Sequence, residues 1–345
     1  MTTKINLTDQ TILVTGAAGF IGHAVTTALL TRYPDCRVIG LDNLNPYYDP
    51  RLKRTRLALL RRFANFTFIK GDITRTQTLH RVFETYRPTL VVHLAAQAGV
   101  GYSITNPDAY IRDNLVGFYQ ILEACRHYHP AHLVYASSSS VYGNQTQIPY
   151  RTTDNVNRPA SLYAATKASN ELMAEAYAHL YQIPATGLRF FTVYGPMGRP
   201  DMAYFKFTER LLRGESIELY NYGQNLRDFT YIDDIVEALL RVLVLPPVGH
   251  RRLNIGKGHP ESVLTLVSDL QAALQRVGLL PADYDMAAHQ KLVPPQPADV
   301  ITTYADISDL VALIDYTPRV PLHEGLQRFA EWYAQSYHAP APHQG

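Results

Sequence analysis

The amino-acid sequence predicts an α/β protein whose first half forms a doubly wound parallel sheet and whose second half forms a smaller C-terminal α/β unit. Three observations support this prediction. Short apolar runs alternate with longer segments of helical periodicity up to residue 190. The runs show no alternation of polar and apolar residues, so we expect strands that are buried on both faces, as in parallel sheets. After residue 190 the regular rhythm ends.

The first half supplies its elements in strand–helix order. The expected strands are the apolar runs at 11–15, 37–41, 66–70, 90–94 and 133–136, with a sixth strand at 185–190. The expected helices lie between them, near 21–32, 50–63, 76–86, 108–128 and 161–182. Alternation of this kind indicates a sheet with helices on both of its faces.

The second half is expected to contain four shorter helices, at 203–213, 232–244, 262–276 and 322–337. Two proline pairs, Pro246-Pro247 and Pro294-Pro295, interrupt it as prolines do in loops. We therefore expect two domains with interlocked segments, divided at residue 190 into 1–190 and 191–345.

Composition narrows the class of protein. The 345 residues are 46% hydrophobic and carry a formal net charge of +2, so the chain can bury a sizeable core and has no global basic field to attract nucleic acid. Neither the two cysteines, Cys36 and Cys125, nor the 13 histidines show metal-ligand spacing, so we expect buried thiols in a reducing compartment and no metal. Because signal-peptide and membrane-span patterns are lacking, we expect a cytoplasmic protein with no membrane partner.

A glycine-rich turn follows the first expected strand. Gly16, Gly19 and Gly22 stand in a GxxGxxG spacing that encloses Phe20 and Ile21, and a helix opens there. Glycines permit a tight turn and a close approach of the backbone to a pyrophosphate, which the N–H groups at a helix N-terminus attract. Alone, the motif equally fits an ordinary glycine-rich turn. Its place between a strand and a helix favours a dinucleotide site.

Asp42 ends the second expected strand and decides which dinucleotide is favoured. A carboxylate at this point accepts hydrogen bonds from the adenosine ribose and repels a 2′-phosphate, so the sequence favours NAD over NADP. The alternative is that Asp42 only caps a loop with Asn43. The first domain, 1–190, is thus expected to be a Rossmann-type NAD-binding domain, and 191–345 a substrate domain.

The third and fourth expected strands end in residues that would face the same ligand. These residues are Asp72 and Ile73 after the third strand, and Leu94, Ala95, Ala96 and Gln97 after the fourth. Ligands of parallel sheets bind at the carboxyl ends of the strands, and small alanines would let a cofactor lie against the backbone. Packing turns are the alternative interpretation.

The candidate reacting groups are a tyrosine, a lysine and a serine run. Tyr163 and Lys167 are four residues apart in a helical segment, so they share one face. A phenol has a pKa of about 10, and we expect the Lys167 ammonium to lower it and make Tyr163 a base. The run Ser137–Ser140 ends the fifth expected strand, where a hydroxyl would bond the reacting oxygen; a polar strand exit is the alternative. Among 24 tyrosines a lone YxxxK carries little weight, so the whole set matters.

Five motifs resemble those of the extended short-chain dehydrogenases/reductases, the NAD-dependent epimerase/dehydratase family that acts on nucleotide sugars: TGAAGFIG, HLAAQAGV, YASSSSVYG, YAATK and GQNLRDFTYIDDIV. The similarity runs in the family's order from residue 10 to residue 335. Within the family, four stretches resemble UDP-glucuronate 4-epimerases: 42–57, 189–203, 296–306 and 322–333. The resemblance implies NAD as cofactor, a UDP-sugar as substrate, and a homodimer formed by the helices near 108–128 and 161–182.

The resemblance also implies roles for matching positions. Tyr163 would be the base and Lys167 its activator, while Ser138, with Ser139 and Ser140 beside it, would bond the sugar 4-oxygen. Other positions would contact the ligands: Ser137 and Phe191 the cofactor, Thr192 and Arg199 the uronate carboxylate, Arg227 the diphosphate and Asp299 the uridine ribose. A guanidinium fits a carboxylate through two parallel hydrogen bonds, which is an independent reason to consider Arg199. A surface arginine in a loop is the alternative.

Three positions depart from the family pattern, which usually has arginine at Gly101, tryptophan at Met197 and glycine at Ala298. These positions bear on the choice of sugar. The expected reaction is reversible NAD-dependent 4-epimerisation of UDP-glucuronate to UDP-galacturonate through a 4-keto intermediate. Three alternatives stay open: a UDP-glucose/UDP-galactose 4-epimerase, a UDP-glucuronate decarboxylase, and an NAD-binding regulator without turnover.

Overall fold

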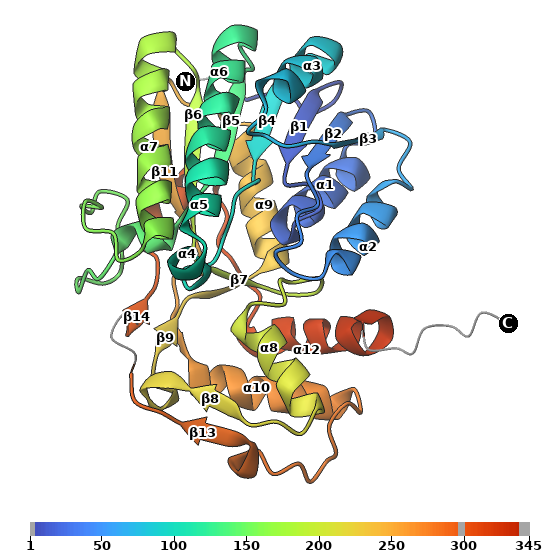
Figure 1. Ribbon diagram of the computed structural model, residues 1–345, viewed down its shortest axis with the longest axis vertical. Coiled ribbons are helices and arrows are strands. Elements are labelled where there is room, and N and C mark those ends of the chain that lie inside the picture. The colour runs from blue at the N-terminus through green and yellow to red at the C-terminus, as the bar shows by residue number, and fades with distance from the viewer. Residues whose placement is uncertain (1–3, 296–300, 338–345) are drawn as a thin grey trace, which may run out of the picture.

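The computed structural model describes residues 4–295 and 301–337 and contains a large layered part and a smaller part beneath it (Figure 1). The large part is built on a seven-stranded sheet in the order β11-β6-β5-β4-β1-β2-β3, in which every neighbouring pair is parallel. Its strands are β1 (Thr11–Thr15), β2 (Arg37–Asp42), β3 (Phe66–Lys70), β4 (Leu90–His93), β5 (His132–Ser138), β6 (Ala185–Phe190) and β11 (His250–Ile255).

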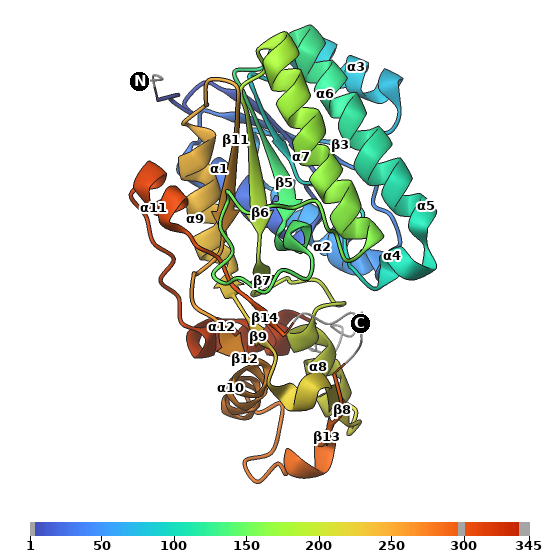
Figure 2. The same ribbon diagram turned by 90° about the vertical axis from the view of Figure 1, so that its left-hand side faces the viewer.

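Helices cover both faces of this sheet, as Figures 1 and 2 show. One face carries α1 (Phe20–Arg32), α2 (Pro50–Leu60) and α9 (Ile232–Leu243), and the other carries α3 (Thr76–Tyr86), α6 (Gly117–Tyr128) and α7 (Leu162–Tyr181). Neighbouring strand residues enter opposite cores: Val14 shares a core with α1 and α9, whereas Leu13 shares one with α3 and α6. Both faces are buried, which explains the continuous apolar runs and confirms the predicted doubly wound α/β fold.

The helix predicted near 108–128 consists of three consecutive helical segments in the structure. A short helix, α5 (Pro107–Tyr110), leads into a π-helical turn (Ile111–Val116), and α6 follows. The Asn114 side chain in this turn accepts from Gln97 N at 2.8 Å and donates to Thr166 Oγ1 at 3.0 Å. Because π turns reorient side chains within a helix, this one connects the segment after β4 to α7.

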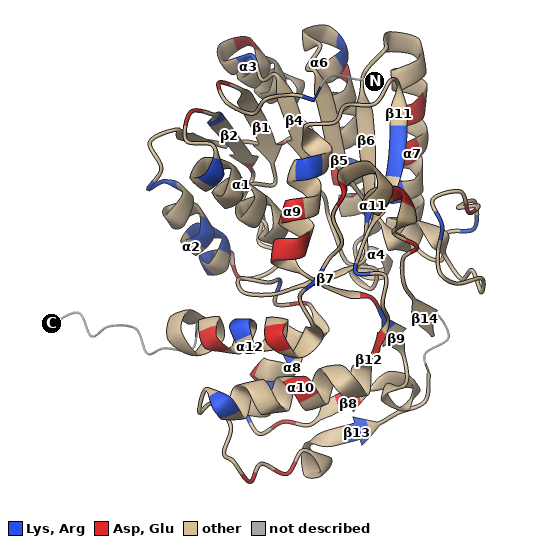
Figure 3. Ribbon diagram, turned by 180° about the vertical axis from the view of Figure 1, so that it is seen from behind, with Lys and Arg blue, Asp and Glu red and all other residues tan. Residues whose placement is uncertain are grey.

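The seventh strand, β11, is not among the predicted strands. Its sequence, HRRLNI, begins with three polar residues that are partly exposed, so it does not read as a buried apolar run. Its basic stretch is blue in Figure 3. The strand pairs in parallel with β6 along its whole length. The second half of the chain therefore returns to the large sheet, where α9 packs beside α1.

The smaller part contains short strands and helices. Its strands are β7 (Thr192–Tyr194), β8 (Ile217–Leu219), β9 (Leu226–Arg227), β10 (Phe229–Tyr231), β12 (Glu261–Ser262), β13 (Gln290–Leu292) and β14 (Thr302–Thr303). Its helices are α8 (Ala203–Leu212), α10 (Val263–Arg276) and α12 (Leu322–Trp332). Two further short helices lie outside the smaller part: α11 (Ser308–Ile314) packs against β11, and the four-residue α4 (Tyr102–Thr105) precedes α5. All four helices predicted in the second half are present, and the last continues from α12 into a π turn. Among the residues described, none of the helices is long and apolar enough to span a membrane.

A buried ion pair joins α7 to β6. The Arg189 guanidinium donates to the Glu171 carboxylate through Nε at 2.9 Å and Nη2 at 2.7 Å, and the two side chains are 1% and 2% exposed. The Ser137 hydroxyl donates to the same carboxylate at 2.6 Å, and Arg189 Nη1 donates to the Tyr142 hydroxyl at 2.9 Å. Because a buried charge is tolerated only when it is paired, these contacts fix α7 against the ends of β5 and β6.

The variant Glu171→Gln removes the charged partner of a buried guanidinium. We expect the free energy of unfolding, measured by urea denaturation, to fall by about 3–5 kcal/mol. Glu175→Gln is the matched control one turn further along α7. The Glu175 side chain is 54% exposed and bonds His250, whose lowered pKa keeps the imidazole neutral, so the variant should lose about 0.5–1.5 kcal/mol, as for a neutral hydrogen bond. Equal losses in the two variants would contradict the stabilising role of the buried pair.

Candidate active site

A pocket with a volume of about 700 Å³ lies across the carboxyl ends of the parallel strands. It contains every site residue predicted from the sequence that falls within the described ranges, while the predicted Asp299 lies outside the described residues. The predicted residues that line it are Gly16, Gly19, Phe20, Ile21, Gly22, Asp42, Asn43, Asp72, Ile73, Leu94, Ala95, Ala96, Gln97, Ser137, Ser138, Ser139, Ser140, Tyr163, Lys167, Phe191, Thr192, Arg199 and Arg227. Their individual roles stay predictions.

Two glycines of the glycine-rich turn, Gly16 and Gly22, have no space for a side chain. Gly16 has a φ of +71°, and a Cβ placed on it would lie 2.8 Å from Ala95 N. A Cβ on Gly22 would lie 2.1 Å from the carbonyl oxygen of Gly16. Helix α1 begins with Gly19 at its N-cap, without a side-chain cap or an acidic residue in its first turn. The turn therefore fits the pyrophosphate of a dinucleotide, which the first N–H groups of α1 would hold.

Two carboxylates follow at the ends of β2 and β3. The Asp42 carboxylate accepts from Ala18 N at 3.1 Å and from Leu44 N at 2.8 Å. It thus caps a local loop, as the alternative interpretation held, but it also lines the pocket, where its oxygens have further lone pairs for a ribose. Burial acts to raise the pKa of Asp72, but hydrogen bonds from Thr74 and Asn43, together with the charge of Arg112, lower the pKa overall.

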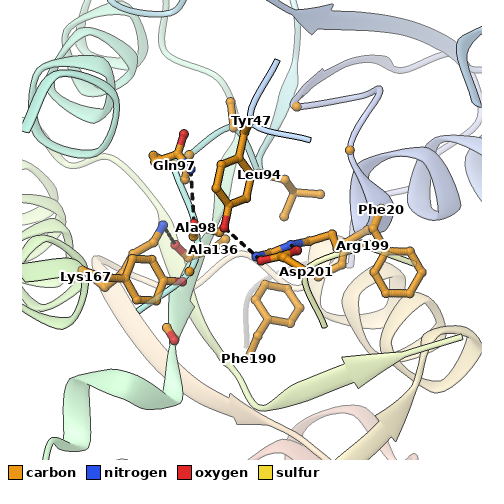
Figure 4. Close-up of a pocket in the computed structure, with 18 of the residues that line it drawn as sticks. Phe20, Tyr47, Leu94, Gln97, Ala98, Ala136, Lys167, Phe190, Arg199 and Asp201 are labelled. Carbon is orange, nitrogen blue, oxygen red and sulfur yellow. Dashed lines mark hydrogen bonds and ion pairs between the residues drawn. The ribbon is translucent and has the colours of Figure 1, made fainter. Parts of the chain in front are cut away.

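Helix α7 brings the candidate reacting groups to the pocket. Ser161 begins the helix, and its Oγ accepts from Ala164 N at 3.1 Å. Tyr163 and Lys167 follow one turn apart and both line the pocket. Lys167 Nζ donates to the carbonyl oxygen of Ala136 at 2.8 Å, which ties the lysine to the end of β5 (Figure 4).

We expected the Lys167 ammonium to lower the pKa of Tyr163, but the groups of the chain together raise this pKa. Burial raises the pKa of Tyr163, because the phenolate loses its hydration. A hydrogen bond from Ser138 and the charge of Arg199 act in the opposite direction. Asp201 acts in the same direction as burial, and the net result is a Tyr163 pKa above its ordinary value. Burial also lowers the pKa of Lys167 to about 8, although Glu171 acts to raise it.

Arg199 meets a carboxylate that the sequence prediction missed. Its Nε donates to Asp201 Oδ1 at 3.0 Å and its Nη2 to Asp201 Oδ2 at 2.5 Å, while the Tyr47 hydroxyl donates to Oδ2 at 3.0 Å. Figure 4 shows the three side chains converging in the pocket. The opposite charge two residues after Arg199 was a signal for Asp201. Tyr47 lies 154 positions away from Asp201 and gave no such signal.

Two lysines that the sequence prediction did not single out also line the pocket. Lys53 is buried, and its Nζ donates to the carbonyl oxygen of Asn45 at 2.9 Å and to its Oδ1 at 2.6 Å. Lys206 comes from α8, in the smaller part. Ammonium groups in a pocket of this kind suit phosphate oxygens.

Two of the three departures from the family pattern fall within the described residues, and Ala298 lies outside them. Gly101 lines the pocket, and a Cβ placed there would meet nothing within 4 Å, so the arginine usual at this position would have open space. Met197 has a φ of +55°, and its carbonyl oxygen accepts from Arg56 Nη2 at 2.6 Å. In the part of the chain that the structure describes, no cluster of three or more His, Cys, Asp and Glu suits a metal ion. The two cysteines are buried free thiols.

Comparison with known proteins identifies the family. Residues 12–256 match the NAD dependent epimerase/dehydratase family. The chain is 44% identical to UDP-glucuronate 4-epimerase 4 of Arabidopsis thaliana, over 95% of this chain and 76% of that protein. The crystal structure of the UDP-glucuronic acid 4-epimerase from Bacillus cereus, in complex with UDP-glucuronic acid and NAD, has a TM-score of 0.84 and 32% identity, covering 95% of this chain and 100% of that one. The UDP-glucose 4-epimerase of Thermotoga maritima, with UDP-glucose, has a TM-score of 0.79 and 31% identity, covering 94% and 98%. The glycine-rich turn, the Tyr163–Lys167 pair and these matches agree, and the chain belongs to the NAD-dependent epimerase/dehydratase family.

Proposed function

We propose that this chain catalyses the reversible NAD-dependent 4-epimerisation of UDP-glucuronate to UDP-galacturonate through a 4-keto intermediate. The observation that carries the proposal is one pocket that contains an anion-binding turn, the Tyr163 phenol and the Arg199 guanidinium. The printed substrates of the Arabidopsis and Bacillus relatives support this choice of sugar.

The pocket suits NAD from end to end. The turn Gly16–Gly22 would hold the pyrophosphate, Asp42 the adenosine ribose, and the segment after β4 the rest of the dinucleotide. Lys167 and Phe191 lie at the end where the nicotinamide would sit. NAD held there would supply a hydride acceptor for C4 and, once reduced, the donor of the same hydride.

The chain's own residues would manage the proton. Tyr163 takes the proton of the 4-hydroxyl, and Ser138 donates a hydrogen bond to the same oxygen. The charge of Arg199 and a hydrogen bond from Ser138 act to lower the Tyr163 pKa, against burial and Asp201, which act to raise it. After the keto sugar turns over in the pocket, Tyr163 returns the proton to the 4-oxygen, and C4 has the inverted configuration.

Arg199 and Thr192 would protect the intermediate. Oxidation of C4 makes the uronate a β-keto acid, which loses CO₂ when its C5–C6 bond stands perpendicular to the plane of the ketone. A guanidinium that binds the carboxylate through two hydrogen bonds restrains the change of ring shape that would bring the C5–C6 bond into this position. Epimerisation without loss of CO₂ depends on this restraint.

A 4-epimerase of neutral UDP-hexoses is the second candidate. One observation favours it: the charge of Arg199 is already balanced by Asp201, so the pocket is not strongly cationic at this point. The similarity to the Thermotoga enzyme is consistent with this alternative. Faster turnover of UDP-glucose than of UDP-glucuronate would make it the better description.

The purified protein is expected to interconvert UDP-glucuronate and UDP-galacturonate, with the products resolved by NMR. Tyr163→Phe removes the proposed base and should lower kcat by about 10²–10⁴-fold. Tyr128→Phe is the control, because this phenol on α6 bonds Glu84 and does not line the pocket. A UDP-pentose as the main product, or full activity of Tyr163→Phe, would refute the proposal.

We also propose that the chain forms a homodimer through α6, α7 and the π turn before α6. The cytoplasmic location expected from the sequence stays a prediction. α6 and α7 lie side by side on the outside of the sheet (Figure 2). They and the π turn expose large apolar side chains, a pattern typical of protein interfaces. These residues are Ile111, Val116, Tyr119, Leu172 and Leu180, which are 42–68% exposed.

Charges introduced on this surface should separate the subunits. The double variant Leu172→Glu and Leu180→Glu is expected to sediment with the mass of one chain, where the wild type sediments with the mass of two. Val248→Glu is the control, since Val248 is also exposed but lies in the loop before β11. A wild type with the mass of one chain would contradict the homodimer.

A further inference from the structure

The Arg199 guanidinium is held by only one of its two edges. Asp201 engages Nε and Nη2, the side edge, as described above. None of the hydrogen bonds between described residues uses Nη1, and the side chain, which is 24% exposed, lines the pocket. A guanidinium offers five N–H donors in a rigid plane. The end edge of this plane, Nη1 and Nη2, therefore has donors for a second carboxylate.

Tyr47 fixes the carboxylate that holds Arg199. Its hydroxyl donates to Asp201, and its ring packs against Tyr102 with centroids 4.8 Å apart. Burial raises the pKa of Tyr47 to about 12, so the phenol stays a donor at neutral pH. Burial acts to raise the pKa of Asp201, but the charge of Arg199 and hydrogen bonds from Arg199 and Tyr47 lower it, so the carboxylate stays charged.

Arg56 fixes the backbone that precedes Arg199. It is fully buried, and its Nη2 donates to the carbonyl oxygens of Met197 at 2.6 Å and Gly198 at 3.1 Å. Its Nη1 donates to the carbonyl oxygen of Ala18, in the glycine-rich turn, at 3.0 Å. Burying a cation is costly unless its donors are hydrogen-bonded. The two Nη groups of Arg56 are bonded in this way, whereas its Nε has no partner among the described residues. The bonds of the Nη groups therefore favour a single arrangement of the two loops.

We propose that Tyr47 and Asp201 are positioning residues that hold Arg199 by its side edge and aim its end edge at the carboxylate of an acidic sugar, on a loop that Arg56 anchors to the cofactor turn. This inference rests on the proposed function. It goes beyond that function because it assigns the selection of an acidic sugar to two residues that need not touch the substrate. It also makes Asp201 a support of the uronate site instead of a competitor for it.

A loosened guanidinium should change the products as well as the affinity. In the competing reaction the C5–C6 bond of the 4-keto uronate breaks and CO₂ leaves. The electron pair forms the C4–C5 enolate, and C5 takes a proton from water. The hydride then returns to C4 and Tyr163 returns its proton to the 4-oxygen, which gives a UDP-pentose. The share of UDP-pentose therefore measures how firmly the carboxylate is held.

The test compares Tyr47→Phe, Asp201→Asn and Asp201→Glu with the wild type, all as NAD-loaded protein. Loss of a hydrogen bond to a charged group corresponds to about a tenfold to hundredfold effect. We expect Asp201→Asn to raise the KM for UDP-glucuronate within that range and to increase the UDP-pentose fraction. Tyr47→Phe should act in the same direction with a smaller effect, and Asp201→Glu should restore part of the loss.

Tyr316→Phe is the matched control, because it removes a phenol that donates to the carboxylate of Asp234 at 2.5 Å, outside the pocket. It should leave KM and the products unchanged. Thermal unfolding of each variant separates loss of fold from loss of positioning, and Tyr47→Phe removes a single oxygen in case Asp201→Asn does not fold.

Two results would overturn the inference. One is a lower KM for UDP-glucuronate in Asp201→Asn, which would make Asp201 a competitor. The other is an unchanged KM and product ratio in Tyr47→Phe and Asp201→Asn. If the wild type does not turn over UDP-glucuronate, the proposed function fails separately. The positioning role is then decided by calorimetry, as the ratio of affinities for UDP-glucuronate and UDP-glucose, and a ratio that is equal in wild type and variants would refute it.

Discussion

All seven strands of the large sheet are parallel, and this constraint determines where the site lies. Two neighbouring parallel strands must be joined by a crossover connection. All seven strands therefore begin at one end of the sheet, and their carboxyl ends all lie at the other end. Gly16, Asp42, Asp72, Ser138 and Phe191 are far apart in the sequence, yet each follows or ends a strand and therefore meets the others in one pocket. The sheet topology alone is therefore enough to bring these residues to the same end of the sheet.

Helix α7 connects that chemistry to the scaffold through one of its faces. Residues four apart lie one turn above each other, and the face passes from Tyr163 to Lys167, Glu171 and Glu175. Tyr163 faces the pocket, Lys167 bonds the end of β5, Glu171 pairs with a buried arginine on β6, and Glu175 bonds His250 on β11. The phenol is thus placed by a column of contacts that crosses three neighbouring strands, so its position depends on the sheet as a whole.

The sequence predicted those features whose physical causes are local. The strands that are buried on both faces, the glycines that a Cβ would block, and Asp42 at a strand end follow from short stretches of residues. Other features depend on distant partners and could not be read in this way. β11 is polar where it lies at the edge of the sheet, and Tyr47 reaches Asp201 only through the fold. Among the chain's own groups, burial, which the sequence does not show, outweighs the neighbouring charges and raises the Tyr163 pKa.

The origin of β11 has a consequence for how this protein can be divided. The strand comes from residues 250–255, yet it completes the sheet whose other strands end at residue 190. A fragment cut at that point would leave the hydrogen-bonding edge of β6 bare and would remove α9 from one apolar face, and exposed edges of this kind promote aggregation. Residues 1–190 and 191–345 therefore do not form two independent sheets. An exchange of whole halves between related chains at residue 190 would have to rebuild the β6–β11 pairing within a shared sheet.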